Sequence, residues 1–166
     1  IIRNLHSWSR PRHVATPIIH FLSRSRVYHD PYGVALIISP WNYPFQLAFL
    51  PIVGAFATGN CVVLKASQQV PHTAVVMEKI LESFPREQIL MIKGDHSVND
   101  QLLSYKFDYI FFTGSTNVGK YVMKKTSENL IPLSLELGGK SPCVVTADAH
   151  LEFAAKRIAW GKFINA

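Results

Sequence analysis

Short apolar runs alternate with helical stretches along most of this chain, and this alternation limits the possible fold more than any other feature of the sequence. The runs lie at residues 34–38, 61–64, 88–92, 109–112, 133–137 and 143–145. Residues 34–38 and 61–64 are apolar throughout, which is typical of strands buried on both faces. Helical patterns occupy residues 44–58, 70–84, 97–103, 116–126 and 151–164. Strands that alternate with helices predict an α/β fold whose mainly parallel sheet carries helices on both faces.

The composition excludes several classes of protein. Hydrophobic residues make up 48% of the chain and charged residues 17%, enough apolar surface for a packed core. The longest candidate for a membrane span, residues 34–58, carries no charge but is interrupted by three prolines, so we predict no membrane-spanning helix. Cys61 and Cys143 lie in apolar runs, and we expect both to be buried, reduced thiols. No Cys or His spacing typical of a metal site is present.

The net charge of +6 is concentrated in the first 30 residues, which hold five arginines against Asp30 alone. The rest of the chain is nearly balanced. A basic arm of this kind suits nucleic acid or a protein partner. Aromatic side chains that would stack on bases do not interleave with the arginines, so we favour a partner-facing arm and expect no nucleic acid. Short apolar pieces at residues 13–30 predict a two-stranded hairpin or an extended arm, and Pro11 is expected to end a helix before it.

Two polar residues follow the first and second predicted strands. In parallel sheets, ligands bind where the carboxyl ends of the strands meet, so these positions are informative. Asn42 lies between Pro40 and Pro44 on a stiff turn, where its amide donates into a site or caps the following helix. Lys65 either bonds hydroxyls or phosphate or is a solvated lysine.

Two further features follow the later strands. The turn at Gly114 and Ser115 opens directly into a helix, whose free N–H groups favour a phosphate. Glu136 stands between two leucines, where burial would make it costly. Desolvation raises the pKa of a carboxyl group and produces a general base near neutrality. Alternatively, Lys140 or the N–H groups of residues 138–139 satisfy this carboxylate.

Three motifs in this order resemble the aldehyde dehydrogenase superfamily. They are Pro-Trp-Asn-Tyr-Pro at residues 40–44, Phe-Thr-Gly-Ser at 112–115, and Leu-Glu-Leu-Gly-Gly-Lys-Ser-Pro at 135–142. The sequences that link them are similar to the class 3, fatty-aldehyde-dehydrogenase-like branch. The resemblance implies a Rossmann-like sheet and NAD(P)-dependent oxidation of a small-molecule aldehyde to a carboxylic acid through a Cys thioester. It also implies that Asn42 holds the oxyanion and that Glu136 activates the hydrolytic water.

The resemblance further implies a binding site for NAD or NADP. Its expected residues are Ser39, Trp41, Lys65, Gln68, Gly114, Ser115, Val118, Gly119 and Leu137. Lys65 corresponds to a lysine that bonds the adenosine ribose, residues 114–119 face the pyrophosphate, and Leu137 meets the nicotinamide end. Gln68 stands where the family usually has a glutamate that selects NAD. We therefore expect a relaxed preference that accepts NADP.

The same resemblance divides the chain. Residues 1–12 end an N-terminal helix, 13–31 form an oligomerisation hairpin, 32–137 form most of the NAD(P)-binding domain, and 138–166 begin the catalytic domain. We expect a homo-oligomer, a dimer, in the intact enzyme, and a cytoplasmic location. We also expect an internal fragment, because the family's nucleophilic Cys would follow just beyond Ala166. The 166 residues alone are therefore expected to be inactive.

Other interpretations remain open at this point. An acylating relative that uses CoA or reduces an acyl phosphate would lack a working Glu136, so this residue favours the hydrolytic type. A non-catalytic dinucleotide-binding module or a structural subunit is the alternative from a different class, since neither Cys61 nor Cys143 stands at the nucleophile's position.

Overall fold

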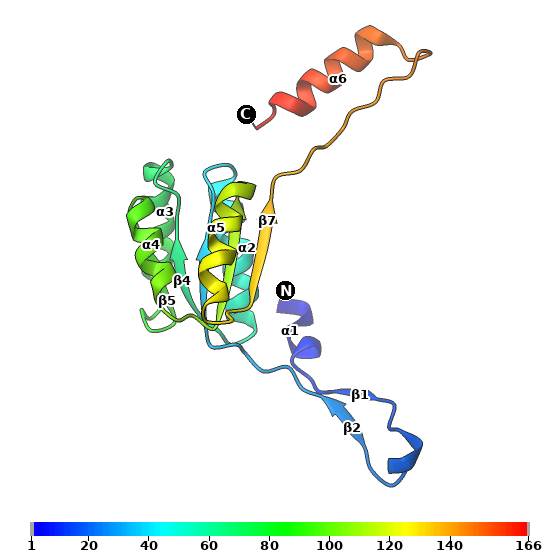
Figure 1. Ribbon diagram of the computed structural model, residues 1–166, viewed down its shortest axis with the longest axis vertical. Helices are drawn as coiled ribbons and strands as arrows, with labels where there is room; N and C mark the ends of the chain where they lie inside the picture. Colours follow the sequence, from blue (N-terminus) through cyan, green and yellow to red (C-terminus); the bar gives the residue numbers. More distant parts are fainter. Residues whose placement is uncertain (1, 166) are drawn as a thin grey trace.

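A five-stranded parallel sheet forms the centre of the molecule (Figure 1). The computed structural model describes residues 2–165. The strands run in the order β5-β4-β3-β6-β7, so β3 is central. Their bounds are β3 Val34–Ile38, β4 Cys61–Lys65, β5 Ile89–Ile92, β6 Tyr109–Gly114 and β7 Leu133–Leu137. The predicted α/β fold is confirmed.

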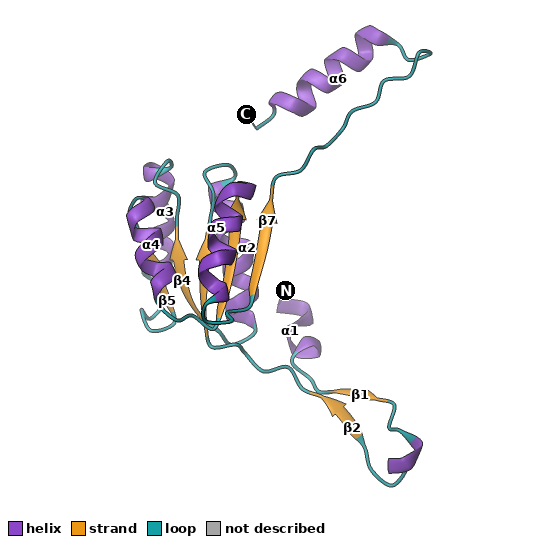
Figure 2. Cartoon of the chain, in the orientation of Figure 1, coloured by secondary structure: helices purple, strands orange, loops and turns teal. Residues whose placement is uncertain are grey.

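Helices cover both faces of this sheet (Figure 2). They are α2 Pro44–Ala57, α3 Pro71–Leu81, α4 His96–Ser104 and α5 Thr116–Ser127. Helices α2 and α3 pack on one face and α4 and α5 on the other. Successive side chains of a strand point to opposite faces, so on β3 Ile37 contacts the first layer while Leu36 and Ile38 contact the second. Both faces of the central strand are therefore buried, as its continuous apolar sequence predicts.

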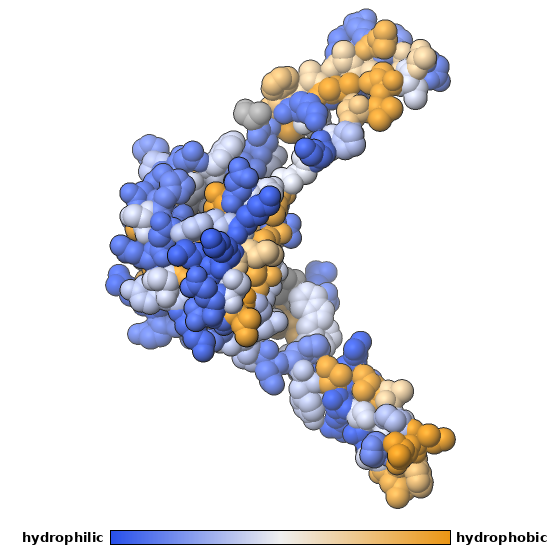
Figure 3. All heavy atoms as spheres, viewed as in Figure 1, coloured by the Kyte–Doolittle hydropathy of each residue, from blue (hydrophilic) through white to orange (hydrophobic). Residues whose placement is uncertain are grey.

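Three segments lie outside this sandwich. Helix α1 (Ile2–Trp8) precedes an antiparallel hairpin of β1 (Arg12–Val14) and β2 (Ser25–Val27), with the short 3-10 helix η1 (Ile18–His20) at its tip. Helix α6 (Leu151–Phe163) lies beyond the opposite end of the sheet, and none of its residues is buried (Figure 1). Apolar side chains are exposed on both projections (Figure 3). The predicted hairpin is confirmed.

Several local predictions are wrong. Residues 143–145 form no strand, because no other described strand pairs with them after the edge strand β7. Cys143 is exposed and Cys61 is only half-buried, so the expected pair of buried thiols is not found. Helix α4 begins at His96, one residue before the predicted 97–103, and Asp95 is its N-cap. By contrast, the predicted helix before Pro11 is present and ends at Trp8.

Within residues 2–165, the structure contains no helix with the length and apolar character needed to span a membrane.

Candidate functional site

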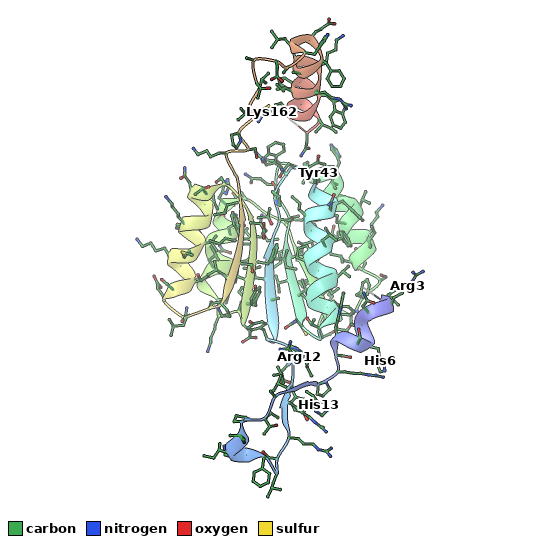
Figure 4. The ribbon with its side chains drawn as sticks, turned by 90° about the vertical axis from the view of Figure 1, so that its right-hand side faces the viewer. Arg3, His6, Arg12, His13, Tyr43 and Lys162 are labelled. Carbon is green, nitrogen blue, oxygen red and sulfur yellow. The ribbon has the colours of Figure 1, made fainter. Side chains whose placement is uncertain are left out.

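A cavity of about 880 Å³ lies at the carboxyl ends of the strands. The chain passes from β3 towards β4 on one side and returns to β6 on the other, which makes the boundary between β3 and β6 the topological switch point. Residues that follow all five strands line the cavity. Tyr43, the last residue before α2, marks this end of the sheet (Figure 4). The volume lies in the range of small-molecule and cofactor sites.

Ten of the eleven predicted site residues line this one cavity. They are Ser39, Trp41, Asn42, Lys65, Gln68, Gly114, Ser115, Val118, Glu136 and Leu137. The exception is Gly119, which is buried beneath β7. A Cβ on Gly119 would lie 2.6 Å from Leu137 Cδ2, so its missing side chain lets α5 approach Leu137 closely. Gly119 therefore shapes the cavity through Leu137 and is not part of its lining.

Asn42 is half-buried in the cavity wall and does not cap helix α2. The N-cap is Tyr43, whose backbone is left-handed (φ 45°) and whose side chain makes no capping hydrogen bond. Pro44 begins the helix, where its fixed φ is favourable. The capping alternative for Asn42 is therefore wrong.

Lys65 is the last residue of β4 and is almost fully buried, with 3% of its surface exposed. Its Nζ donates a hydrogen bond of 2.8 Å to the Ala66 carbonyl oxygen. Burial lowers the pKa of Lys65, and the negative charge of Asp95 acts in the opposite direction. The alternative of a solvated lysine is wrong, and a desolvated cation on the cavity wall suits an oxygen-rich ligand.

Ser39 provides a second unusual polar group. It is 4% exposed, its backbone N–H donates to the Lys65 carbonyl oxygen at 3.1 Å, and it lines the cavity. Its Oγ atom is buried and has no hydrogen-bond partner among the described residues. Buried hydroxyl groups are normally paired, because an unmade hydrogen bond costs free energy. This orphaned hydroxyl fits a ligand that carries hydrogen-bonding oxygens.

The turn after β6 brings a helix N-terminus to the cavity. Ser115 is the N-cap of α5, and its Oγ accepts a hydrogen bond of 3.4 Å from the backbone N–H of Val118. A Cβ on Gly114 would lie 2.6 Å from the Phe112 ring, so a larger residue would displace that ring. The first N–H groups of a helix carry a partial positive charge and favour a phosphate group.

Glu136 is exposed, which corrects the expectation of a carboxylate desolvated on an apolar strand. It pairs with Thr113 of β6, but β7 is the edge of the sheet and its far side has no neighbour among the described residues. The ion pairs of residues 2–165 do not involve Glu136 or Lys140, so the alternative of a salt bridge is also wrong. Glu136 is therefore part of the cavity wall and is accessible to water.

Three lining residues that follow β5 were not predicted from the sequence: Asp95, His96 and Asn99. Asp95 Oδ1 accepts hydrogen bonds from the Ser97 backbone N–H (2.9 Å) and from Ser97 Oγ (2.6 Å). These bonds lower the pKa of Asp95. The sequence could have indicated Asp95, because Asp95 follows the third predicted strand just as Lys65 follows the second.

Neither cysteine lines the cavity. Cys61 is the first residue of β4 and pairs with Val34, at the amino ends of the strands. Cys143 lies exposed in the segment after β7. The thiols are therefore outside the cluster that contains Asn42 and Glu136.

Comparison with known proteins decides the family. The model of the aldehyde dehydrogenase family matches residues 9–166. This chain belongs to the aldehyde dehydrogenase family. It is 44% identical over 165 residues to 4,4'-diaponeurosporen-aldehyde dehydrogenase of Staphylococcus aureus, covering 99% of the chain and 36% of that protein. It is 42% identical over 166 residues to mouse aldehyde dehydrogenase family 3 member B3, covering 99% of the chain and 35% of that protein.

Solved structures of this family have the same fold. A substrate-bound Staphylococcus aureus AldH superimposes with a TM-score of 0.91 at 44% identity, covering 97% of this chain and 35% of that one. A betaine aldehyde dehydrogenase from the same organism, in complex with NAD+, has a TM-score of 0.78 at 35% identity, covering 88% and 29%. The chain thus spans about a third of the length of these aldehyde dehydrogenases. The predicted family and its class 3 branch are confirmed.

Proposed function

We propose that this chain forms the cofactor-binding part of an aldehyde dehydrogenase that oxidises an aldehyde to a carboxylic acid with NAD or NADP. The observation that supports this most directly is one cavity lined by Asn42, Glu136, Lys65 and the turn that begins at Gly114. Solved relatives of the same fold bind NAD+, which is consistent with a dinucleotide in this cavity.

The residues present fit a dinucleotide. We propose that Lys65 and the unpaired Ser39 hydroxyl bond its ribose and phosphate oxygens, while the N-terminus of α5 faces the pyrophosphate. Val118, exposed on α5, packs against the adenine side. Gln68 is neutral, so NADP is accepted beside NAD. When bound, the cofactor supplies the hydride acceptor.

Asn42 and Glu136 take the two polar roles. We propose that the Asn42 amide N–H donates to the oxygen that becomes negatively charged when a thiolate adds to the aldehyde carbon. Once this adduct had lost hydride to a bound cofactor and become a thioester, Glu136 would accept a proton from the water that hydrolyses it, and its exposure leaves it accessible to that water. We assign the thiolate to neither Cys61 nor Cys143, because both lie away from the cavity.

The hairpin is proposed as the subunit contact of a homodimer. Its tip exposes the apolar side chains of Ile18, Ile19, Phe21 and Leu22, each at least three-quarters exposed. Isolated apolar side chains are common on surfaces, but a cluster on a projecting arm is typical of an interaction site. We propose residues 138–166, which include the exposed helix α6, as the start of the catalytic domain.

Two variants of the intact protein test the catalytic assignments, with hexanal and NAD+ as substrates. Asn42→Ala should lower kcat about 100- to 1000-fold, the usual effect of losing one oxyanion donor. Since Asn42 does not cap α2, this variant should fold normally. Glu136→Gln should still release about one equivalent of NADH per site in a burst and then stop, because hydrolysis of the thioester is blocked.

Asn129→Ala and Glu87→Gln are matched controls, because both residues are exposed and do not line the cavity. Unchanged kinetics in Asn42→Ala and Glu136→Gln would contradict the assignments. The alternative of a non-catalytic dinucleotide-binding module is favoured by the position of both cysteines outside the cavity. Tight NAD+ binding without any aldehyde-dependent NADH would support that alternative.

A further inference from the structure

One carboxylate stands at the adenosine end of the proposed cofactor cleft. The cavity is lined by two acidic residues, Asp95 and Glu136. Glu136 belongs to the edge strand β7, whereas Asp95 follows β5, which is the direct neighbour of β4. Lys65, the proposed ribose ligand, is paired with Ile92 at the end of β5, just before Asp95. Asp95 therefore lies on the Lys65 side of the cleft.

The Asp95 carboxylate is fixed in place and its charge reaches Lys65. As the N-cap of α4, it accepts both hydrogen bonds from Ser97, so the side chain cannot turn away without losing the cap. Its negative charge acts on the Lys65 ammonium on the same side of the cleft. The ion pairs of residues 2–165 do not include Asp95, so no close cation neutralises it.

We propose that Asp95 is the specificity-determining residue that discriminates against a phosphate on the adenosine ribose, and so sets how far NAD is preferred over NADP. This inference rests on the proposed function, because it requires a dinucleotide in the cleft. Gln68 leaves its own position neutral, so the negative charge at this end comes from Asp95. His96, beside it, adds positive charge only when protonated.

The discrimination follows from charge. A ribose hydroxyl donates a hydrogen bond to a carboxylate, and carboxylates hold this hydroxyl in other NAD sites. A ribose phosphate carries a charge of about −1.5 to −2 near neutral pH and cannot donate in the same way. Asp95 therefore repels the phosphate, while Lys65 attracts the hydroxyl and the phosphate alike. NADP binds, but less tightly than it would without Asp95.

The substitution Asp95→Asn tests this with little disturbance of the fold. Asparagine is as good an N-cap as aspartate, so the variant removes the charge and keeps the start of α4. Dissociation constants of NAD+ and NADP+ are measured by calorimetry on the intact protein at fixed ionic strength. We expect the ratio of the two constants to shift about tenfold towards NADP+, the size of effect that one charge exerts at a few ångströms in a water-filled cleft.

Glu128→Gln is the matched control, since this exposed residue at the far end of α5 loses the same charge. The control should leave the ratio unchanged, and added salt should weaken the discrimination of the unmodified protein. An unchanged ratio in Asp95→Asn, or an equal loss of affinity for both dinucleotides, would overturn the role of Asp95 while the proposed function stands. If the unmodified protein bound neither dinucleotide, the proposed function itself would fail, and this inference with it.

Discussion

The substitution Lys65→Met should make the protein more stable and less able to bind NAD+. Lys65 is 3% exposed, and its ammonium group makes one hydrogen bond within the described chain, to the Ala66 carbonyl oxygen. A buried charge with so few partners is poorly compensated for the water it loses. Methionine has a similar length and no charge, so it fills the same space without that cost.

The expected gain in stability is the desolvation penalty that is removed minus the hydrogen bond that is lost. The loss of the hydrogen bond to Ala66 costs about 1 kcal/mol. The desolvation of a buried ion costs several kcal/mol, and here the open cavity and Asp95 reduce that penalty. We therefore expect Lys65→Met to raise the free energy of unfolding by about 1–2 kcal/mol. In a protein of this size each kcal/mol raises Tm by about 2–4 °C.

The lowered pKa of Lys65 determines whether the stability of the protein rises or falls with pH. Burial lowers the pKa of Lys65 from its ordinary value of 10.5, so below that value the unfolded chain binds more protons than the native chain. The stability of the unmodified protein should therefore rise as the pH approaches 10.5, and the advantage of Lys65→Met should fade over the same range. Affinity for NAD+ should fall at least about tenfold, because a charged hydrogen bond is lost.

Urea denaturation across this pH range measures the stability, and calorimetry measures NAD+ binding. Lys120→Met is the matched control, since Lys120 is exposed on α5 and should change neither quantity appreciably. The reasoning is refuted if Lys65→Met is less stable than the unmodified protein near neutral pH. It is refuted equally if the gain persists undiminished near the ordinary pKa of lysine.

Two further predictions concern the core and the hairpin. Ile110→Ala should lower the free energy of unfolding by about 2–5 kcal/mol, because Ile110 is fully buried in the layer that contacts α4 and α5. Urea denaturation measures this loss. A loss below about 1 kcal/mol, the size expected of a surface substitution, would contradict the prediction. Phe21→Ser should weaken dimer formation without lowering the stability of the sheet, because Phe21 is 76% exposed at the hairpin tip. Sedimentation velocity at several concentrations tests this, and an unchanged dissociation constant would show that the tip lies outside the dimer contact.

Local patterns in the sequence were enough to predict the five strands of the parallel sheet and most helices. The run at 34–38 is apolar at every position because both of its faces are covered, and this follows from its residues alone. The same strand-and-helix alternation located Asn42 and Lys65 just where two strands end. Because parallel strands end at one edge, their convergence on one cavity was predictable without coordinates.

Burial and pairing were decided by the tertiary structure. Glu136 sits between leucines and yet is exposed, because it points to the face opposite Leu135, which packs against the core, and β7 lies at the edge of the sheet. Residues 143–145 have the composition of a strand and lack a partner to pair with. Asp95 joins Lys65 in the cleft only because β5 lies next to β4. Strand order arises from contacts between residues far apart in the chain. A local sequence pattern therefore does not predict which strands pair with each other.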